Sequence, residues 1–468
     1  MSSLRQILDA IAAAGGHPFE VGGCVRDSLL GIACKDVDIE VFQLSIAELI
    51  DVLGQFGEVH EVGVSFGVIK LRLATGEFLD FTLPRRDSKE GRGHKGFRVE
   101  VDHSLSISEA AARRDFTINA ISRDCRDGRL VDPHGGIADL EQRVLRHVSP
   151  HFAEDPLRVL RGMQFAGRFD LTLADATAEL CRSLLSEFTT LSIERVWGEW
   201  HKWATKSRLP SRGLEFLNQS GWLEHFPELA ALRGVPQDPE WHPEGDTWVH
   251  TLFVCDAAAT VADRENLSED QRVVLLLAAL CHDLGKATTT EFLDGRWRAH
   301  GHCDAGVPLA QQFLARIGCP LAIIETVLPQ VQEHLVHTQR DISPRLVRRL
   351  ALRLAPATIE QLLHLVEADM SGRPPLPGGL PASARQLAEI AHGLALHGQK
   401  PQPILLGRYL IARGFTPSEW FGEVLALCFE AQLEGTFTEL EDGLRFLDEL
   451  LRQLPPPPPP EPRRKSVR

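Results

Sequence analysis

Two segments decide the fold class of the first part of this chain: VGGCVRDSLLG at residues 21–31 and DVDIEVF at residues 36–42. In the first, an apolar strand pattern runs through a glycine turn into a helical pattern, and in the second, charged and apolar residues alternate. Further strand patterns occur at residues 68–73 and 78–83. Together they predict a mixed α/β domain, whereas helical periodicity dominates from about residue 140 onward.

The glycine turn is a candidate phosphate cradle. Backbone amides at the start of a helix bind phosphates, and Gly22 and Gly23 stand at such a start. Arg26 follows in the first turn, where its guanidinium could hold a triphosphate through charge-assisted hydrogen bonds. A Gly-Gly turn by itself is more often only a tight turn, so this prediction depends on the segment that follows.

Acidic residues alternate along that second segment. A strand has a period of two, so Asp36, Asp38 and Glu40 share one face and the apolar residues share the other. Phosphoryl transfer uses such a pair of carboxylates to hold two divalent ions roughly 4 Å apart. Asp80, in a neighbouring strand pattern, is a possible third acid. The alternative is a strand whose acidic face is simply solvated.

The pattern Gly-Gly-x-Val-Arg-Asp at 22–27, followed by Asp-x-Asp at 36–38, resembles the signature of the class II tRNA nucleotidyltransferases and bacterial poly(A) polymerases of the polymerase β superfamily. Three more segments extend the resemblance in the family's order: residues 113–120, 132–136 and 154–161. The resemblance covers at least residues 17–170. It implies an α/β nucleotidyltransferase head with a mixed sheet, which uses CTP, ATP and Mg²⁺ to extend tRNA.

The resemblance also implies roles for individual residues. Asp36 and Asp38 are expected to be catalytic and to bind the metal. Nucleotide binding is expected of Gly23, Arg26, Arg114, Asp155, Arg158 and Arg161.

Residues 154–161 are expected to lie on a helix, where Asp155, Arg158 and Arg161 recur every three residues and form one stripe. A carboxylate beside a guanidinium can imitate the pairing edge of a base, and a well-made pair discriminates by about 1–3 kcal/mol. The resemblance implies this use for Asp155 and Arg158, so that C or A is selected without a nucleic-acid template. The alternative is an intrahelical surface ion pair.

Residues 85–97 are rich in glycine and charge and predict a mobile loop. In the family, a flexible loop here is associated with switching from C to A addition, and enzymes that add only A tend to lack it. Its presence favours full CCA addition. Basic residues here and between 158 and 168 are also candidates for a local RNA-binding face, which a chain of net charge −14 requires.

A second set of candidate ligands lies in the helical part. His250 falls in a helical pattern, and the apolar run 273–281 is expected to be a buried helix that presents His282 and Asp283 at its end. Asp369 is a matching later acid. Imidazoles and carboxylates bind transition metals, so these residues predict a four-ligand site. A lone histidine on an apolar helix, by contrast, is usually a hydrogen-bonded core residue.

This pattern resembles the HD phosphohydrolase superfamily, and residues 242–373 resemble the HD domain appended to some bacterial CCA-adding enzymes. The resemblance implies hydrolysis of phosphate esters such as 2′,3′-cyclic phosphates. A divalent transition metal such as Ni²⁺ or Mn²⁺ would lower the pKa of bound water there. His302 and His334 are further candidates for a second metal or for phosphate binding.

Composition and turn signals divide the chain into five expected parts. They are a head at 1–140, a helical neck at 141–235, an HD domain at 236–375, a carboxy-terminal helical region at 376–454 and a disordered proline-rich basic tail at 455–468. Apolar runs are far shorter than the roughly 20 residues of a membrane span, and the amino terminus lacks a secretory pattern. We therefore expect a cytoplasmic protein with no membrane partner.

The leading hypothesis is a bifunctional enzyme. It would add C, C and A to the 3′ end of tRNA by two-metal phosphoryl transfer and hydrolyse phosphate esters in its HD domain. An A-only tRNA nucleotidyltransferase or a poly(A) polymerase would share the head. A catalytically inactive RNA-binding module is the alternative from a different class, and the retained acidic and basic residues of the head argue against it.

Overall fold

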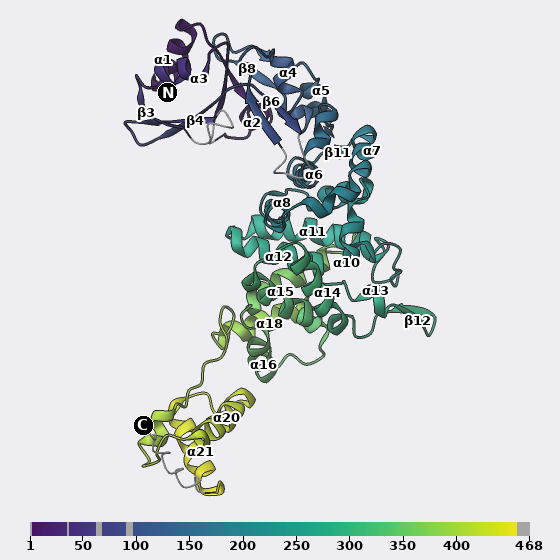
Figure 1. Cartoon of the computed structure of the whole chain (residues 1–468). Coiled ribbons are helices and arrows are strands. Elements are labelled where there is room, and N and C mark those ends of the chain that lie inside the picture. Colours follow the sequence, from purple (N-terminus) through teal and green to yellow (C-terminus); the bar gives the residue numbers. More distant parts are fainter. Residues whose placement is uncertain (1, 35–36, 62–67, 90–96, 456–468) are drawn as a thin grey trace, which may run out of the picture. The chain divides into compact units, whose positions relative to one another are not determined.

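The structure, a computed structural model of the chain, describes residues 2–34, 37–61, 68–89 and 97–455 (Figure 1). The chain forms two compact units. Unit 1 comprises residues 1–231 and 315–319, and unit 2 comprises residues 232–314 and 320–468. The finer division into five parts stays a prediction, and the expected tail at 455–468 lies outside the described residues apart from Pro455.

Unit 1 contains a seven-stranded mixed sheet with the strand order β3-β4-β5-β2-β1-β8-β9. β2 and β5 run parallel, and the other neighbouring pairs run antiparallel. The strands are β1 (His17–Val21), β2 (Asp38–Phe42), β3 (Gly57–Glu61), β4 (Val68–Leu73), β5 (Phe78–Thr82), β8 (Ser122–Asp124) and β9 (Leu130–Val131). The predicted mixed α/β head is confirmed.

Helices complete unit 1. They are α1 (Ser2–Ala13), α2 (Gly23–Leu29), α3 (Ile46–Leu53), α4 (Ile107–Ala111), α5 (Gly136–Glu141), α6 (Leu157–Phe169), α7 (Asp175–Ser183), α8 (Ile193–Lys206), α9 (Pro210–Gln219) and α10 (Pro227–Ala230). α6 packs against α8 and α9. The approach to α9 is close, because a Cβ on Gly162 would lie 2.4 Å from the Phe216 ring. Glycine at this position therefore allows the close approach of α6 to α9.

The alternation along β2 separates an apolar face of the sheet from a polar one, as predicted. Ile39 and Val41 are buried in a core that includes apolar residues of α1 and α3. Asp38 and Glu40 point to the other face, where they line a cavity. The two helices thus cover one face of the sheet and leave the other to a functional site.

The segment after β5 departs from the prediction. Residues 85–101 contain the antiparallel strands β6 (Arg85–Lys89) and β7 (Phe97–Val101), so the expected mobile loop over 85–97 is wrong for its first part. Residues 90–96 lie outside the described residues. The physical reason is that β6 pairs with β7. The sequence of β7, Phe97-Arg98-Val99-Glu100-Val101, alternates as a strand does. Its backbone hydrogen-bonds to that of β6, and this pairing does not depend on the side chains of β6.

Unit 2 is mostly helical, which confirms the predicted helical body. Its helices are α11 (Thr247–Arg264), α12 (Glu269–Cys281), α13 (Lys286–Thr289), α14 (His302–Arg316), α15 (Leu321–Glu333), α16 (Pro344–Leu354), α17 (Ile359–Ser371), α18 (Ala382–Gly393), α19 (Gly407–Ile411), α20 (Glu419–Glu434) and α21 (Leu440–Gln453). A short hairpin joins β12 (Glu291–Leu293) to β13 (Arg296–Arg298).

α12 is the central helix of the HD part of unit 2. Residues 273–281 are buried, and α11, α15 and α17 pack around them. This explains why the run is apolar on all sides rather than along one stripe. Within the described part of the chain, the structure contains no helix that combines the length and the apolar character needed to cross a membrane.

Candidate active sites

A cavity of about 650 Å³ opens on the polar face of the sheet in unit 1. The glycine turn after β1, parts of β2 and β5, residues 113–119 and the beginning of α6 surround it. The predicted residues that line it are Gly23, Arg26, Asp38, Arg114, Asp155, Arg158 and Arg161. Asp36 lies outside the described residues. The structure therefore brings together the predicted head residues that it describes.

The glycine turn is required by its backbone and by its neighbour. Gly22, the residue before α2, has a φ of 73°, a conformation that favours glycine. A Cβ at this position would lie 2.9 Å from Nη1 of Arg114. The turn can therefore approach the Arg114 guanidinium closely only as glycine, and the predicted phosphate cradle lies at the cavity wall.

The acidic residues of the sheet have different surroundings. Asp38 pairs in register with Asp80 on the parallel strand β5, and such partners point to the same face. Lys70 Nζ donates to Asp80 at 3.2 Å, and Arg114 Nη2 donates to Glu40 at 3.2 Å. Glu40 and Asp80 thus each have a basic partner. Asp38 lines the cavity and is the carboxylate expected to bind metal.

Arg26 is turned into the protein. Its side chain is 4% exposed and donates to Asp27 Oδ1 at 2.8 Å and to Asn119 Oδ1 at 2.5 Å. The guanidinium also lies 4.3 Å from the centroid of the Phe169 ring. These contacts make Arg26 part of the cavity wall, and a direct contact between Arg26 and a triphosphate stays a prediction.

Asp115 is a buried acid to which the sequence patterns assigned no role. Its Oδ2 accepts from Arg161 at 2.9 and 2.7 Å, and its Oδ1 accepts from Asn119 at 2.8 Å. Burial alone would raise the pKa of this carboxyl, but Arg161 and Asn119 outweigh it and hold the pKa below the usual value. Arg161 therefore ties α6 to the 113–119 segment. The signal was available as a single acid inside the Arg-Arg-Asp-Phe segment.

Asp155 precedes α6 instead of lying on it, which corrects the predicted stripe. Pro156 explains the difference, because a proline favours the first position of a helix and α6 begins just after it. Asp155 Oδ1 accepts from the Leu157 amide at 3.1 Å, and Oδ2 accepts from Arg195 Nη2 at 2.7 Å. The carboxylate is thus held at the start of the helix, facing the cavity.

Arg158 does not pair with Asp155, so the alternative of an intrahelical ion pair is wrong. Its Nη1 donates to the His151 carbonyl at 2.6 Å, and its Nη2 donates to the Arg113 carbonyl at 2.9 Å. Arg195, from α8, also lines the cavity, and the sequence analysis missed it because it stands in an amphipathic helix outside every motif. Contacts from separate segments therefore fix both candidate base-reading side chains.

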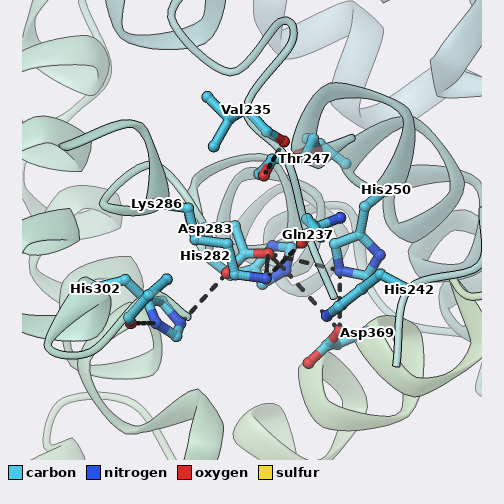
Figure 2. Close-up of polar contacts among 12 residues, drawn as sticks. Val235, Gln237, His242, Thr247, His250, His282, Asp283, Lys286, His302 and Asp369 are labelled. Carbon is cyan, nitrogen blue, oxygen red and sulfur yellow. Dashed lines mark hydrogen bonds and ion pairs between the residues drawn. The ribbon is translucent and has the colours of Figure 1, made fainter. Parts of the chain in front are cut away.

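The second site lies in unit 2, where three helices bring the four predicted metal ligands together (Figure 2). His250 is on α11, Asp369 is near the end of α17, and His282 and Asp283 directly follow α12. α12 ends at Cys281, as its apolar run predicts. All four ligand side chains are buried.

The donor atoms of these four residues converge. His250 Nε2 lies 3.1 Å from Asp369 Oδ1 and 3.6 Å from Asp283 Oδ2. His282 Nε2 lies 3.2 Å from Asp283 Oδ2 and 4.0 Å from Asp369 Oδ1. Two imidazoles and two carboxylates that surround one point have the arrangement of a metal-ligand set.

His302 and His334 form a second cluster on the other oxygen of Asp283. Their Nε2 atoms lie 3.4 and 3.9 Å from Asp283 Oδ1 and 3.2 Å from each other. Figure 2 shows Asp283 between His302 on one side and His250 with Asp369 on the other. Burial lowers the pKa of His334 to about 3, so its imidazole is neutral and able to ligate. Each oxygen of the Asp283 carboxylate therefore lies near a different pair of histidines.

Three buried atoms of this site make no hydrogen bond with the residues that the structure describes: His282 Nε2, Asp283 Oδ1 and Asp283 Oδ2. Lys286 Nζ lies 2.7 Å from Asp283 Oδ2 and forms an ion pair with it, but the angles of this contact are not those of a hydrogen bond. Leaving a carboxylate buried in this state is costly, and a divalent cation would compensate for it. The donor set therefore fits a divalent metal.

Glu244 is a buried acid that the sequence analysis missed. Its Oε1 lies 2.8 Å from Nδ1 of His250 and 2.9 Å from Nδ1 of His242. Burial would raise the pKa of Glu244, but the two histidines lower it to about 2. Carboxylates in this position fix the orientation of a metal-binding imidazole, here with Nε2 of His250 directed toward the metal ligands. The signal was a lone acid next to the start of the HD resemblance at His242.

Comparison with known proteins finds family models for parts of both units. The Poly A polymerase head domain family matches residues 19–146, and the HD domain family matches residues 247–366. The multifunctional CCA protein of Xanthomonas campestris pv. campestris (strain B100) is 40% identical over 365 residues, covering 75% of this chain and 84% of that protein. The multifunctional CCA protein of Xylella fastidiosa (strain M23) is 40% identical over 365 residues, covering 75% and 83%.

Solved structures share the fold. The Bacillus stearothermophilus CCA-adding enzyme in complex with CTP has a TM-score of 0.65 at 22% identity, covering 97% of this chain and 98% of that one. The Thermotoga maritima CCA-adding enzyme complexed with tRNA_CCA has a TM-score of 0.60 at 20% identity, covering 96% and 94%. With its match to the Poly A polymerase head domain, its match to the HD domain and these relatives, the chain belongs to the family of multifunctional CCA proteins and is a CCA-adding nucleotidyltransferase with an HD domain.

Proposed function

We propose that the unit 1 cavity adds C, C and A to the 3′ end of tRNA, with CTP and ATP as substrates and Mg²⁺ held by Asp36 and Asp38. The observation that supports this most is that a single cavity holds Asp38, the glycine turn and the Asp155 and Arg158 side chains. Two divalent ions would activate the attacking 3′ hydroxyl and stabilise the leaving pyrophosphate. Solved relatives contain CTP or ATP.

Asp155 and Arg158 have the chemistry to choose these two bases. Both C and A present an amino group beside an acceptor nitrogen on their pairing edge, whereas U and G present a carbonyl beside a ring N–H. A carboxylate accepts from the amino group and a guanidinium donates to the ring nitrogen, so the pair favours C and A. Because other segments hold both side chains in position, the protein itself replaces a template.

The direct test is to incubate the pure protein with tRNA lacking its 3′ end and with each labelled nucleotide. We expect two C residues followed by one A. A single A without C would identify an A-only enzyme, and a long A tail would identify a poly(A) polymerase. No incorporation under any condition would favour the inactive RNA-binding module.

Asp155→Ala and Arg158→Ala are expected to relax base choice more than they affect folding. The ratio of kcat/KM for CTP to that for UTP should fall by about 5- to 150-fold, as loss of a base-edge contact worth about 1–3 kcal/mol implies. Kinetics with CTP, ATP, UTP and GTP measure this ratio. Arg208→Ala, which removes an exposed arginine outside the cavity lining, is the matched control. An unchanged preference in both cavity variants would contradict base reading by this pair.

We further propose that the unit 2 site hydrolyses phosphate esters, including 2′,3′-cyclic phosphates at RNA ends. The buried oxygens of Asp283, which lack hydrogen bonds within the described structure, support this most directly. A bound ion such as Ni²⁺ or Mn²⁺ would lower the pKa of a coordinated water toward neutrality. A cavity of about 420 Å³ beside both histidine clusters gives the substrate access to Asp283, His302 and His334.

In this reaction, water adds to phosphorus and one ring P–O bond breaks, which leaves a phosphate monoester. Asp283 and Asp369 would hold the cation, and Lys286, next to Asp283 at the cavity, would bind a phosphate oxygen. Purified protein is expected to hydrolyse a nucleoside 2′,3′-cyclic phosphate with added Ni²⁺ or Mn²⁺. If the protein hydrolyses the substrate with none of the three added ions, Ni²⁺, Mn²⁺ or Mg²⁺, this function is contradicted. A cytoplasmic location stays a prediction.

A further inference from the structure

The cavity of the HD site has aromatic walls that metal binding does not explain. Trp241, shortly before α11, and Trp297, on β13, both line it. They are 57% and 37% exposed, respectively. Large aromatic surfaces that remain open to solvent at a cavity are typical of sites that bind a partner or a planar ligand.

The hairpin of β12 and β13 presents Trp297. It projects from the helices of unit 2 beside α13 (Figure 1). Phe292 pairs with Trp297 in register, and their rings meet edge to face with centroids 5.0 Å apart. Phe292 is itself 58% exposed, so this pair contributes little to a hydrophobic core. The neighbouring ring supports one edge of the indole while part of it stays open to a ligand.

Cationic side chains line the same cavity: Lys286, Arg298 and Arg373. Arg373 Nη2 contacts Met370 Sδ at 2.7 Å, and its Nε is buried with no hydrogen-bond partner in the described part of the chain. A buried guanidinium nitrogen without an acceptor is costly, and an anionic ligand would satisfy it. Arg298 lies 4.0 Å from the exposed Asp294, a separation too long for a hydrogen bond.

We propose that Trp297 and Trp241 are the base-recognition residues of this cavity and hold the terminal nucleotide of its RNA substrate by stacking. Its base stacks on Trp297 and Trp241. Its phosphates lie near Arg298 and Arg373, and its terminal phosphate ester reaches Asp283. The inference rests on the proposed phosphohydrolase function and adds the residues that recognise the base, because an inorganic or sugar phosphate would leave both indoles without a partner. Stacking is tolerant of base identity, so RNA ends of different sequence are accepted.

The test compares hydrolysis of two substrates by the full chain with added Mn²⁺: adenosine 2′,3′-cyclic phosphate and ribose 2′,3′-cyclic phosphate, which has no base. Trp297→Ala is expected to raise KM about tenfold for the nucleoside substrate, within the range measured for lost base stacking, and to leave KM for the base-free substrate unchanged. Trp297→Phe should restore most of the difference. Phe253→Ala, which removes an exposed aromatic residue of α11 outside the cavity, is the matched control.

A second measurement uses no metal and no turnover. In EDTA, adenosine 2′,3′-cyclic phosphate should quench tryptophan fluorescence of the wild-type protein more than that of Trp297→Ala. An equal KM change for both substrates, or equal quenching in both proteins, would overturn the inference. A third result would also overturn the inference: Trp297→Ala dissociates a dimer of the protein, and the nucleotide still quenches the fluorescence of that variant. The exposed hairpin would then be an interface between two copies of the chain. If the wild type hydrolyses neither substrate, the phosphohydrolase proposal fails, and the quenching still decides whether a base stacks on Trp297.

Discussion

Asp38→Ala should lower the addition of C and A by at least about 10²- to 10³-fold, the range for removing one preorganised electrostatic group from an active site. Asp38 is the described carboxylate at the start of β2 that lines the cavity beside the glycine turn, and it is the residue expected to hold the metal. Incorporation of labelled CTP and ATP into tRNA lacking its 3′ end measures the effect. Asp36→Ala is expected to behave in the same way.

The loss should not come from unfolding. Asp38 is exposed on the polar face of the sheet, whereas the core packs on the other face. Asp9→Ala is the matched control, because Asp9 is an exposed acid on α1 that pairs with Arg5. It should add nucleotides at the wild-type rate. Hydrolysis in unit 2 should persist in Asp38→Ala, and addition at an undiminished rate by that variant would refute the two-metal assignment.

Local patterns were sufficient for the parts of the head that depend on local geometry. The period of two along β2 correctly separated Ile39 from Asp38, because one face of the strand is buried and the other is not. The glycine turn was likewise correctly placed, since a φ of 73° at Gly22 and a close side chain demand glycine. The alternation along β2 and the glycine turn can both be predicted from a few consecutive residues.

Contacts between distant segments were not readable in this way. Asp155 was placed on a helix because its spacing to Arg158 is helical, but Pro156 starts the helix after it and Arg195 holds it from α8. The loop expected at 85–97 was inferred from charge and glycine, but β7, the strand that pairs with β6, begins at the last residue of that segment and continues to Val101. Spacing and composition therefore gave wrong predictions where contacts with another segment of the chain determine the local structure.

The same limit applies to the HD site. The order of His250, His282, Asp283 and Asp369 along the chain indicated four ligands, and three helices bring them together. The position of Asp283 between two histidine clusters follows from how α12 packs, which no single motif encodes. The packed structure shows that Asp283 contacts both histidine clusters, one with each carboxylate oxygen.

Asp283→Asn is accordingly expected to abolish metal-dependent hydrolysis of 2′,3′-cyclic phosphates with Ni²⁺, Mn²⁺ and Mg²⁺. One oxygen of Asp283 faces His250 and His282, and the other faces the second histidine cluster, so the substitution removes charge from both. Asparagine keeps the volume of the side chain and limits damage to the fold. CCA addition should stay within about twofold of wild type, because the residues that select nucleotides lie in the unit 1 cavity.

Thermal unfolding gives a readout that does not depend on turnover. A ligand at 100 times its Kd stabilises the native state by about 2.7 kcal/mol, which corresponds to roughly 5–10 °C for a unit of this size. The wild type should show such a shift with Mn²⁺ or Ni²⁺, and Asp283→Asn should lose most of it. Asp270→Asn is the matched control, since Asp270 is an exposed acid at the other end of α12.

Substitutions of the histidines then show whether the site binds one metal ion or two. If Asp283 bridges two ions, His282→Ala and His334→Ala should each remove part of the metal-induced shift, because each belongs to a different cluster. If a single ion binds at the four predicted ligands, His334→Ala should keep the whole shift. A full shift together with undiminished hydrolysis in Asp283→Asn would mean that these residues bind no catalytic metal. The buried oxygens of Asp283 would then need another partner, with Lys286, at 2.7 Å, the nearest charge.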